Sequence, residues 1–205
     1  PIRLGITHVH QFYTRRNLAT LAMIAAKSCG QRCAIVFQSI NSTLSSKIVR
    51  YNMGHRGNGP VSGTLYIPSL IAEANALKLI KGKQKDFVQV FNLTCGFNGA
   101  YINLASTSNI QNINKNTIDY IFTDPPFGGN LNYSELSFLW EAWLKVVTNS
   151  KTEAIMSRKQ KKGLQEYQQL MVQCFAEYYR VLKPGRWMTM VFHNSQNAVW
   201  NAIQE

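Results

Sequence analysis

The tetrapeptide Asp124-Pro125-Pro126-Phe127 places a carboxylate, a stiff backbone and an aromatic ring side by side. The prolines fix their own φ angles, lack N–H donors and disfavour helical conformations in the residues before them. The Asp124 carboxylate and the Pro125 carbonyl are therefore predicted to be rigidly held acceptors. Such a pair suits the amino group of an aromatic base, because acceptors that hold its hydrogens draw the nitrogen lone pair out of conjugation. Phe127 is the predicted stacking surface for that base.

The run from Ile118 to Thr123 leads into this tetrapeptide and is rich in β-branched and aromatic residues. That composition predicts a buried parallel strand that is covered on both faces. Open parallel sheets bind ligands at the carboxyl ends of their strands, which is where Asp124 would lie. A plain strand exit in an α/β protein is the alternative interpretation of the four residues alone.

Further segments join the tetrapeptide in a resemblance to a known family. Asp124–Phe127 matches the Asp/Asn/Ser-Pro-Pro-Tyr/Phe motif of amino-group methyltransferases that depend on S-adenosylmethionine. The wider sequence resembles prokaryotic DNA methylases of the N-4/N-6 type, over the later half of their catalytic domain. The matching segments are Thr123–Gly128, Asn132–Leu136, Trp140–Leu144 and Tyr179–Gly185.

The resemblance implies a fold, an activity and a cofactor. The fold would be a partial Rossmann-like class I methyltransferase sheet with helices on both faces, in an α/β protein with an N-terminal helical segment. The activity would be methyl transfer from S-adenosylmethionine to an exocyclic base amine of DNA, as in restriction-modification. The Asp at the first motif position favours adenine N6 over cytosine N4. Asp124–Phe127 would be catalytic, and Ser106 and Thr123 would bind the cofactor.

One part of the family pattern is missing from the sequence. Methylases of this kind carry an Asp-Pro-Phe-x-Gly-x-Gly loop after the first strand, and no stretch of this chain fits it. We therefore expect the chain to be the later half of a longer enzyme, or to need a second chain that completes the cofactor site. Alone, it is expected to bind S-adenosylmethionine weakly or not at all. The segment Ala198–Glu205, which ends within a predicted helix, adds to the expectation of a longer protein.

Basic residues outnumber acidic ones, with 22 Lys and Arg against 10 Asp and Glu and a formal net charge of +12. This excess favours a polyanionic partner such as DNA. A solvated protein face is the alternative for any short basic run. The candidate DNA contacts are Tyr133, Arg158, Lys159, Lys161, Lys162, His193 and Asn194. For His193, a simple role at the end of a strand is equally open.

Helical periodicity and capping residues predict the elements around this site. Thr14 caps a first helix that runs to about Ser28, and Arg15 and Arg16 in its first turn oppose the helix dipole. These arginines need an anion or an acidic neighbour unless solvent alone screens them. Further helices are predicted over Arg32–Arg50, Ser69–Ile80, a segment that follows Asn132, and Leu164–Leu182. Strands are predicted over Phe87–Leu93, Ala100–Leu104 and Trp187–Phe192, with a turn at Asn98-Gly99.

Residues 1–60 are predicted to form a helical segment with a Gly-rich loop, and residues 61–205 the catalytic α/β portion of one incomplete domain. No apolar run has transmembrane length, and the four cysteines lack metal-ligand spacing. We therefore expect no metal site, no membrane partner and a cytoplasmic protein. Two other functions stay open: a methyltransferase of bases in structured RNA, and a non-catalytic nucleic-acid-binding subunit.

Overall fold

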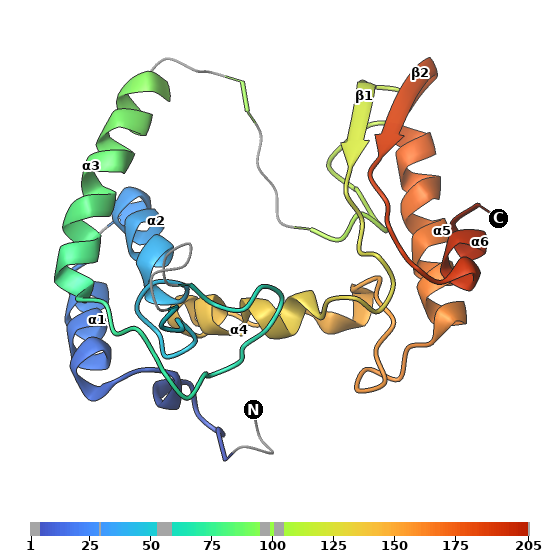
Figure 1. Ribbon diagram of the computed structural model, residues 1–205. Coiled ribbons are helices and arrows are strands. Elements are labelled where there is room, and N and C mark those ends of the chain that lie inside the picture. The colour runs from blue at the N-terminus through green and yellow to red at the C-terminus, as the bar shows by residue number, and fades with distance from the viewer. Residues whose placement is uncertain (1–4, 29, 53–58, 95–98, 101–104, 205) are drawn as a thin grey trace. The chain divides into compact units, whose positions relative to one another are not determined.

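The computed structural model describes residues 5–28, 30–52, 59–94, 99–100 and 105–204 (Figure 1). Helices are combined in it with a small two-stranded parallel sheet. In chain order the elements are the 3-10 helix η2 (Val9–Phe12), α1 (Arg15–Lys27), α2 (Gly30–Asn41), α3 (Ala76–Thr94), β1 (Ile118–Thr123), α4 (Tyr133–Leu144), the 3-10 helix η3 (Ser150–Thr152), α5 (Leu164–Val181), β2 (Leu182–Met190) and α6 (Asn197–Gln204).

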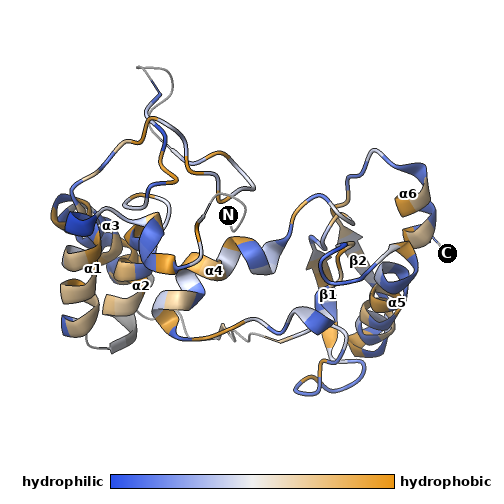
Figure 2. Cartoon of the chain, turned by 90° about the horizontal axis from the view of Figure 1, so that it is seen from below, coloured by the Kyte–Doolittle hydropathy of each residue, from blue (hydrophilic) through white to orange (hydrophobic). Residues whose placement is uncertain are grey.

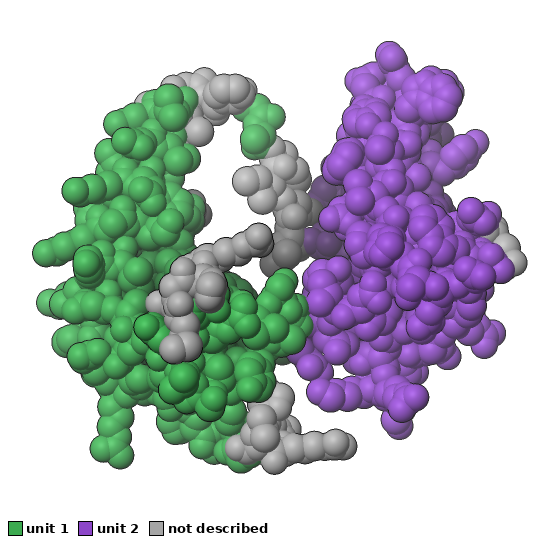
Figure 3. Space-filling view, viewed as in Figure 1, with its two compact units in different colours: residues 1–100, 136–147 green, residues 101–135, 148–205 purple. Residues whose placement is uncertain are grey.

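Internal contacts divide the chain into two compact units, which Figure 3 shows in different colours. Unit 1 comprises residues 1–100 and 136–147, and unit 2 comprises residues 101–135 and 148–205. The two units are defined by their internal contacts and do not test where a domain begins. The domain boundary predicted between residues 60 and 61 therefore stays a prediction. Each unit has a hydrophobic core of its own.

α1 is the first α-helix of unit 1, and it starts where the sequence predicts. The Thr14 side chain accepts a hydrogen bond from the Asn17 backbone N–H at 3.2 Å, as an N-cap does. The helix is capped at Ser28, two residues before the predicted stop at Gly30, and Gly30 instead begins α2. The buried core of the unit consists of Phe12, Tyr13, Leu21, Phe37, Ile40, Ile48, Ala76 and Leu139.

The second helix is shorter than the sequence predicts. α2 ends at Asn41, so the prediction of a helix as far as Arg50 is wrong. The segment after it is rich in serine, and the Ser45 hydroxyl donates to the Ile40 carbonyl at 2.6 Å while the Ser46 hydroxyl donates to the Ser42 carbonyl. Serine hydroxyls compete with backbone N–H groups for such carbonyls, which ends the helix.

The third helix starts later than predicted. The Asn75 side chain accepts hydrogen bonds from the backbone N–H groups of Leu77 and Lys78 at 3.0 and 3.1 Å. Asn75 therefore caps a helix that begins at Ala76, and the predicted cap at Ser69 is wrong. An Asn side chain satisfies the same orphan donors as Ser.

The strand predicted at Phe87–Leu93 is also wrong, because this segment lies inside α3. Its aromatic and β-branched residues resemble those of a strand. Phe87 and Phe91 are one helical turn apart, however, and their ring centroids lie 5.9 Å from each other. α3 packs on α1 and α2, and this tertiary contact prevails over local preference. Residues 101–104 of the strand predicted at Ala100–Leu104, Asn98 of its predicted turn and much of the Gly-rich loop lie outside the described ranges.

α4 contributes its first three residues to unit 2 and the rest to unit 1. In unit 1 its apolar residues are buried only in part: Leu139 is completely buried, whereas Leu144 is 50% exposed. The Trp143 Nε1 donates to the Tyr13 hydroxyl at 3.0 Å, and the Trp143 ring meets the Phe37 ring edge-on at 5.2 Å. These contacts place the indole in the core with its polar atom satisfied.

Unit 2 is organised around β1 and β2, which pair in parallel with Tyr120 opposite Trp187 and Thr123 opposite Met190. The strand predicted ahead of Asp124 is confirmed as β1, and the long helix predicted from Leu164 is confirmed as α5. α5 contacts both β2 and α6. In Figure 2 this helix mixes hydrophobic and hydrophilic residues, as expected of a helix with one face on a core.

β2 begins directly after α5, earlier than the predicted start at Trp187. The helix ends at Val181, ahead of Pro184-Gly185, and this dipeptide lies in an irregular part of the strand. Ile118 pairs with Leu182 and Tyr120 pairs with Trp187, so the residues between the two β2 partners bulge out of register. Gly185 has a φ of +73°, a left-handed conformation that glycine adopts without strain.

One face of this sheet is open to solvent. Tyr120, Phe122 and Trp187 are 54, 66 and 78% exposed. The prediction that the strand is covered on both faces is therefore wrong for the described part of the chain. The opposite face carries Thr123, whose hydroxyl lies 3.2 Å from the Tyr178 hydroxyl of α5.

Candidate functional site

A cavity of about 310 Å³ lies at the carboxyl end of β1, within unit 2. Sequence reasoning placed a binding site at this end of the strand. The predicted residues that line the cavity are Ser106, Thr123, Asp124, Pro125, Pro126 and Tyr133. The structure thus brings together three segments that are separated in the sequence.

Asp124 and Pro125 are the two predicted acceptors. The Asp124 side chain is exposed at the cavity. Within the described residues, no group forms a hydrogen bond or an ion pair with its carboxylate, and none donates to the Pro125 carbonyl. Both acceptors therefore keep their hydrogen-bonding capacity.

Pro126 is fixed from behind by Tyr167 of α5. The Tyr167 hydroxyl donates to the Pro126 carbonyl at 2.8 Å, and the Tyr167 side chain is completely buried. Burial raises the pKa of Tyr167 to about 12, against the opposing effect of a hydrogen bond from the Gly128 backbone. The phenol is therefore a neutral donor at all ordinary pH values, and it holds the diproline segment against the core.

Phe127 is turned away from the cavity. Its ring meets the Phe192 ring edge-on at 5.4 Å, and its carbonyl accepts a hydrogen bond from the Asn194 Nδ2 at 2.8 Å. Asn194 is 7% exposed, and its Oδ1 also accepts from the Gln196 backbone N–H at 2.7 Å. Asn194 therefore connects the loop after β1 to the chain after β2. Its predicted neighbour His193 is exposed.

Gly128 completes this loop with a φ of +70°. A Cβ at this position would lie 3.2 Å from the Val199 side chain and 3.3 Å from the Asn194 amide nitrogen. The positive φ therefore favours glycine at this point, and a Cβ would also need these side chains to shift.

Tyr133 supplies an aromatic ring to the cavity in place of Phe127. It opens α4 and is 39% exposed. Burial raises the pKa of Tyr133, and the nearby carboxylates of Asp124 and Glu153 raise it further. The side chain therefore presents a neutral ring and hydroxyl group to a ligand.

Glu153 lines the cavity and was missed by sequence reasoning. Its carboxylate accepts hydrogen bonds from the Ser134 backbone N–H at 2.9 Å, the Ser134 hydroxyl at 2.8 Å and the Gln160 amide at 2.8 Å. Burial alone would raise the pKa of Glu153, but the hydrogen bonds from Gln160 and Ser134 prevail and lower it. Glu153 thus satisfies the first turn of α4, whereas Glu135 of that turn pairs with Lys159 at 2.8 Å. No local signal connects residues so far apart in the sequence.

The opposite wall of the cavity comes from the loop before β1. The Ser106 hydroxyl lies 2.8 Å from that of Ser108, and the Thr107 hydroxyl donates to the Cys174 thiol at 3.3 Å. Further along the loop, Arg180 of α5 donates to the Ile110 carbonyl at 2.6 Å. These contacts anchor the loop to α5.

Glu177 also holds this loop. Its carboxylate accepts from the Ile110 backbone N–H at 2.7 Å and pairs with Arg180 at 2.8 Å. The Arg180 hydrogen bond and that of the Ile110 backbone lower the pKa of Glu177 to about 2. The pair therefore keeps both charges over the whole neutral range.

The four predicted basic contacts differ in their environment. Lys162 donates to the carbonyls of Ser150 and Glu153, both at 2.6 Å, and burial lowers its pKa against the attraction of the Glu153 carboxylate. Lys159 pairs with Glu135, as described above. Arg158 and Lys161 are exposed, and neither has an ion-pair partner among the described residues. These two are the better placed for an external phosphate.

Three general findings concern the whole described chain. Outside the undescribed segments, no three His, Cys, Asp or Glu side chains are close enough together to hold a metal ion. Among the helices that the structure describes, none combines the length and apolar character that crossing a membrane requires. Comparisons with protein-family models, with curated proteins and with solved structures found no match to the chain.

Proposed function

We propose that the chain is the base-binding part of a methyltransferase that uses S-adenosylmethionine to methylate an exocyclic amine of a nucleobase, with adenine in DNA as the favoured target. The observation that carries this proposal is the pair of uncommitted acceptors at Asp124 and Pro125, beside a cavity at the end of β1. An amino group has two hydrogens to donate, and the two acceptors can take both.

The surroundings of these acceptors suit that role. Tyr167 and Asn194 hold the carbonyls of Pro126 and Phe127, so the backbone next to the two acceptors is fixed before a ligand arrives. Dipoles that are already oriented need no reorganisation when charge develops on the ligand. Tyr133 offers its ring to the base, a contact worth about 1–3 kcal/mol by analogy with other base–aromatic stacks.

Access to the amine requires that the base leave its duplex. Extrusion costs a few kcal/mol, and contacts to the phosphate backbone offset it. The exposed side chains of Arg158 and Lys161 follow the cavity-lining Glu153 in sequence and belong to the same unit. They are the proposed backbone contacts.

The methyl donor is not accommodated by the described residues together with a base. A cavity of about 310 Å³ is at the lower end of the range for small-molecule sites, about 300–1,000 Å³. Besides Asp124, the acidic side chain in its described lining is Glu153, whose oxygens already accept three hydrogen bonds. We therefore propose that S-adenosylmethionine needs further protein, from a preceding half or a second chain. We propose that the same additional protein extends the β1–β2 sheet into a Rossmann-like sheet.

The experiment compares adenine, which has two amine hydrogens, with a derivative in which methyl groups replace both. Adenine and N6,N6-dimethyladenine are titrated into the chain by isothermal calorimetry. Adenine should bind about tenfold more tightly or better, because hydrogen bonds to charged groups are worth about 1.5–3 kcal/mol. Asp124→Ala should remove the preference, whereas Asp119→Asn, at the other end of β1, should retain it. Equal binding of both ligands to the unmodified chain would contradict the proposal.

One observation favours a second candidate, a non-catalytic nucleic-acid-binding subunit. The Phe127 ring packs on Phe192 and is not presented to the cavity, as a base-stacking residue of a catalytic motif would be. In such a subunit, Asp124→Ala would leave the affinity for DNA or structured RNA unchanged. The unmodified chain would also bind adenine and N6,N6-dimethyladenine with equal affinity. Competition between duplex DNA and tRNA separates the DNA enzyme from an RNA enzyme.

A further inference from the structure

The first turn of α1 contains two arginines, and the structure treats them differently. Arg16 forms an ion pair with Glu73 at 2.9 Å, and Glu73 also accepts a hydrogen bond from the Thr14 hydroxyl. Arg15 has no acidic partner among the residues that the structure describes. A cation at a helix N-terminus is unfavourable unless negative charge offsets it. That need is met for Arg16 and not for Arg15.

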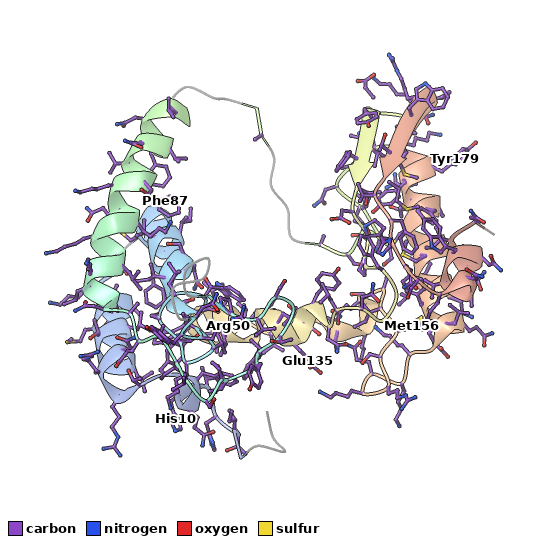
Figure 4. All side chains as sticks on the ribbon, viewed as in Figure 1. His10, Arg50, Phe87, Glu135, Met156 and Tyr179 are labelled. Carbon is purple, nitrogen blue, oxygen red and sulfur yellow. The ribbon has the colours of Figure 1, made fainter. Side chains whose placement is uncertain are left out.

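Arg15 lines a cavity of about 500 Å³ in unit 1. His10, labelled in Figure 4, and Lys47 line it as well. Lys47 is half-buried, and its ammonium group has no hydrogen-bond or ion-pair partner within the described ranges. Its backbone N–H donates to the Phe12 carbonyl at 2.7 Å, which ties the residue to the end of η2.

Negative charge is missing from this cavity. None of the described residues that line it is acidic. The Tyr13 hydroxyl accepts from the Trp143 Nε1 at 3.0 Å, and burial raises the pKa of Tyr13 to about 12, so the phenol stays neutral. Two cationic side chains, an imidazole and the N-terminus of α1 therefore share one hollow, and an anion that enters it would offset their mutual repulsion.

The size and the walls of the cavity indicate the kind of anion. Its volume greatly exceeds that of an inorganic ion, and Ile6, Leu18 and Ile67 give it an apolar side. An organic phosphate uses both parts: its phosphate group meets the guanidinium, which binds it in a bidentate fashion, and its remainder covers the apolar side. Helix N-termini bind phosphate for the same electrostatic reason.

We propose that the cavity formed by His10, Arg15 and Lys47 binds the phosphate group of a nucleotide, either free or within a nucleic acid strand. This site lies in unit 1 and uses none of the residues that we assign to base methylation. It goes beyond the proposed function and stands or falls separately from it.

The test measures binding of adenosine monophosphate to the full chain by isothermal calorimetry, with adenosine and inorganic phosphate as comparison ligands. Arg15→Gln and Lys47→Gln should each weaken the nucleotide about tenfold or more, and Arg15→Lys should restore part of the loss. Arg16→Gln and Lys81→Gln remove the same charge outside the cavity and should change affinity less than about threefold. Circular dichroism establishes that every variant is folded.

Two arms distinguish the source of the phosphate. A short single-stranded oligonucleotide that binds more tightly than the mononucleotide, and is weakened by the same two variants, identifies a strand phosphate. A mononucleotide that binds more tightly than the oligonucleotide identifies a free ligand. The proposal is overturned if adenosine binds as well as its monophosphate, if neither phosphate ligand binds, or if Arg16→Gln and Lys81→Gln weaken binding as much as Arg15→Gln. Asp124→Ala should leave nucleotide binding unchanged, which separates this site from the base cavity.

Discussion

Replacing Asn194 with alanine should destabilise unit 2, because this side chain joins the loop after β1 to the chain after β2. Asn194→Ala removes the donor to the Phe127 carbonyl at 2.8 Å and the acceptor of the Gln196 N–H at 2.7 Å. Each hydrogen bond contributes about 1 kcal/mol net, and leaving a partner unsatisfied in a site that is 7% exposed adds to the loss. We expect the free energy of unfolding to fall by about 2–4 kcal/mol.

Urea unfolding followed by circular dichroism gives this change, and amide hydrogen exchange at Gln196 gives a local reading of it. A loss of 2 kcal/mol corresponds to exchange about thirty times faster. His193→Ala is the matched control, since the neighbouring side chain is exposed and should change stability by less than about 0.5 kcal/mol. If the two variants unfold alike, the role that we assign to Asn194 is refuted.

Three other outcomes follow from contacts around the base cavity. Gly128→Ala should destabilise the chain by about 1–2 kcal/mol in urea unfolding, because φ is +70° and the new Cβ would crowd side chains at 3.2 and 3.3 Å; an unchanged midpoint would contradict this. The Arg180 hydrogen bond lowers the pKa of Glu177 from 4.5 to about 2, so the stability that it contributes is complete above pH 4.5 and is lost as the pH falls towards 2. Glu177→Gln should flatten that part of the unfolding profile, and an unaltered profile would count against the pair. Lys161→Gln should reduce the slope of log K for DNA binding against log salt concentration by about one unit. Lys162→Gln should instead lower the free energy of unfolding, because the Lys162 ammonium donates to two backbone carbonyls. The reverse pattern would contradict our assignment.

Local sequence signals predicted the elements whose causes are local. The Thr14 cap, the strand before Asp124 and the helix from Leu164 are confirmed, because capping chemistry, β-branched composition and helical periodicity act over a few residues. The same reasoning failed at Phe87–Leu93, where the residue types favour a strand and packing on neighbouring helices imposes a helix. It also failed at Ser42–Ser46, where hydroxyl groups end a helix that the apolar spacing would continue.

The residues of the candidate site could likewise be predicted where their roles have local causes, and not where these depend on contacts between distant segments. Six of the residues chosen from the sequence line one cavity. Thr123–Pro126 are consecutive at the end of β1, and Ser106 and Tyr133 come from the segments before and after it. The part played by Glu153 depends on a contact with Ser134 across the fold, which no local pattern encodes. The orientation of Phe127 is set by Phe192, a residue on a separate segment. The ion pair between Lys159 and Glu135 also joins residues far apart in the sequence. The sequence alone therefore could not show that Lys159 is paired within the protein while Lys161 is exposed without an ion-pair partner among the described residues.

The most direct measurement of the central claim is the site at which adenine binds, mapped by nuclear magnetic resonance on the isotopically labelled chain. Our account predicts that adenine shifts the signals of Thr123 and Tyr133 in the cavity and leaves those of Tyr120 and Phe122 on the open sheet face unchanged. Shifts confined to Tyr120 and Phe122, with the cavity signals unmoved, would contradict it.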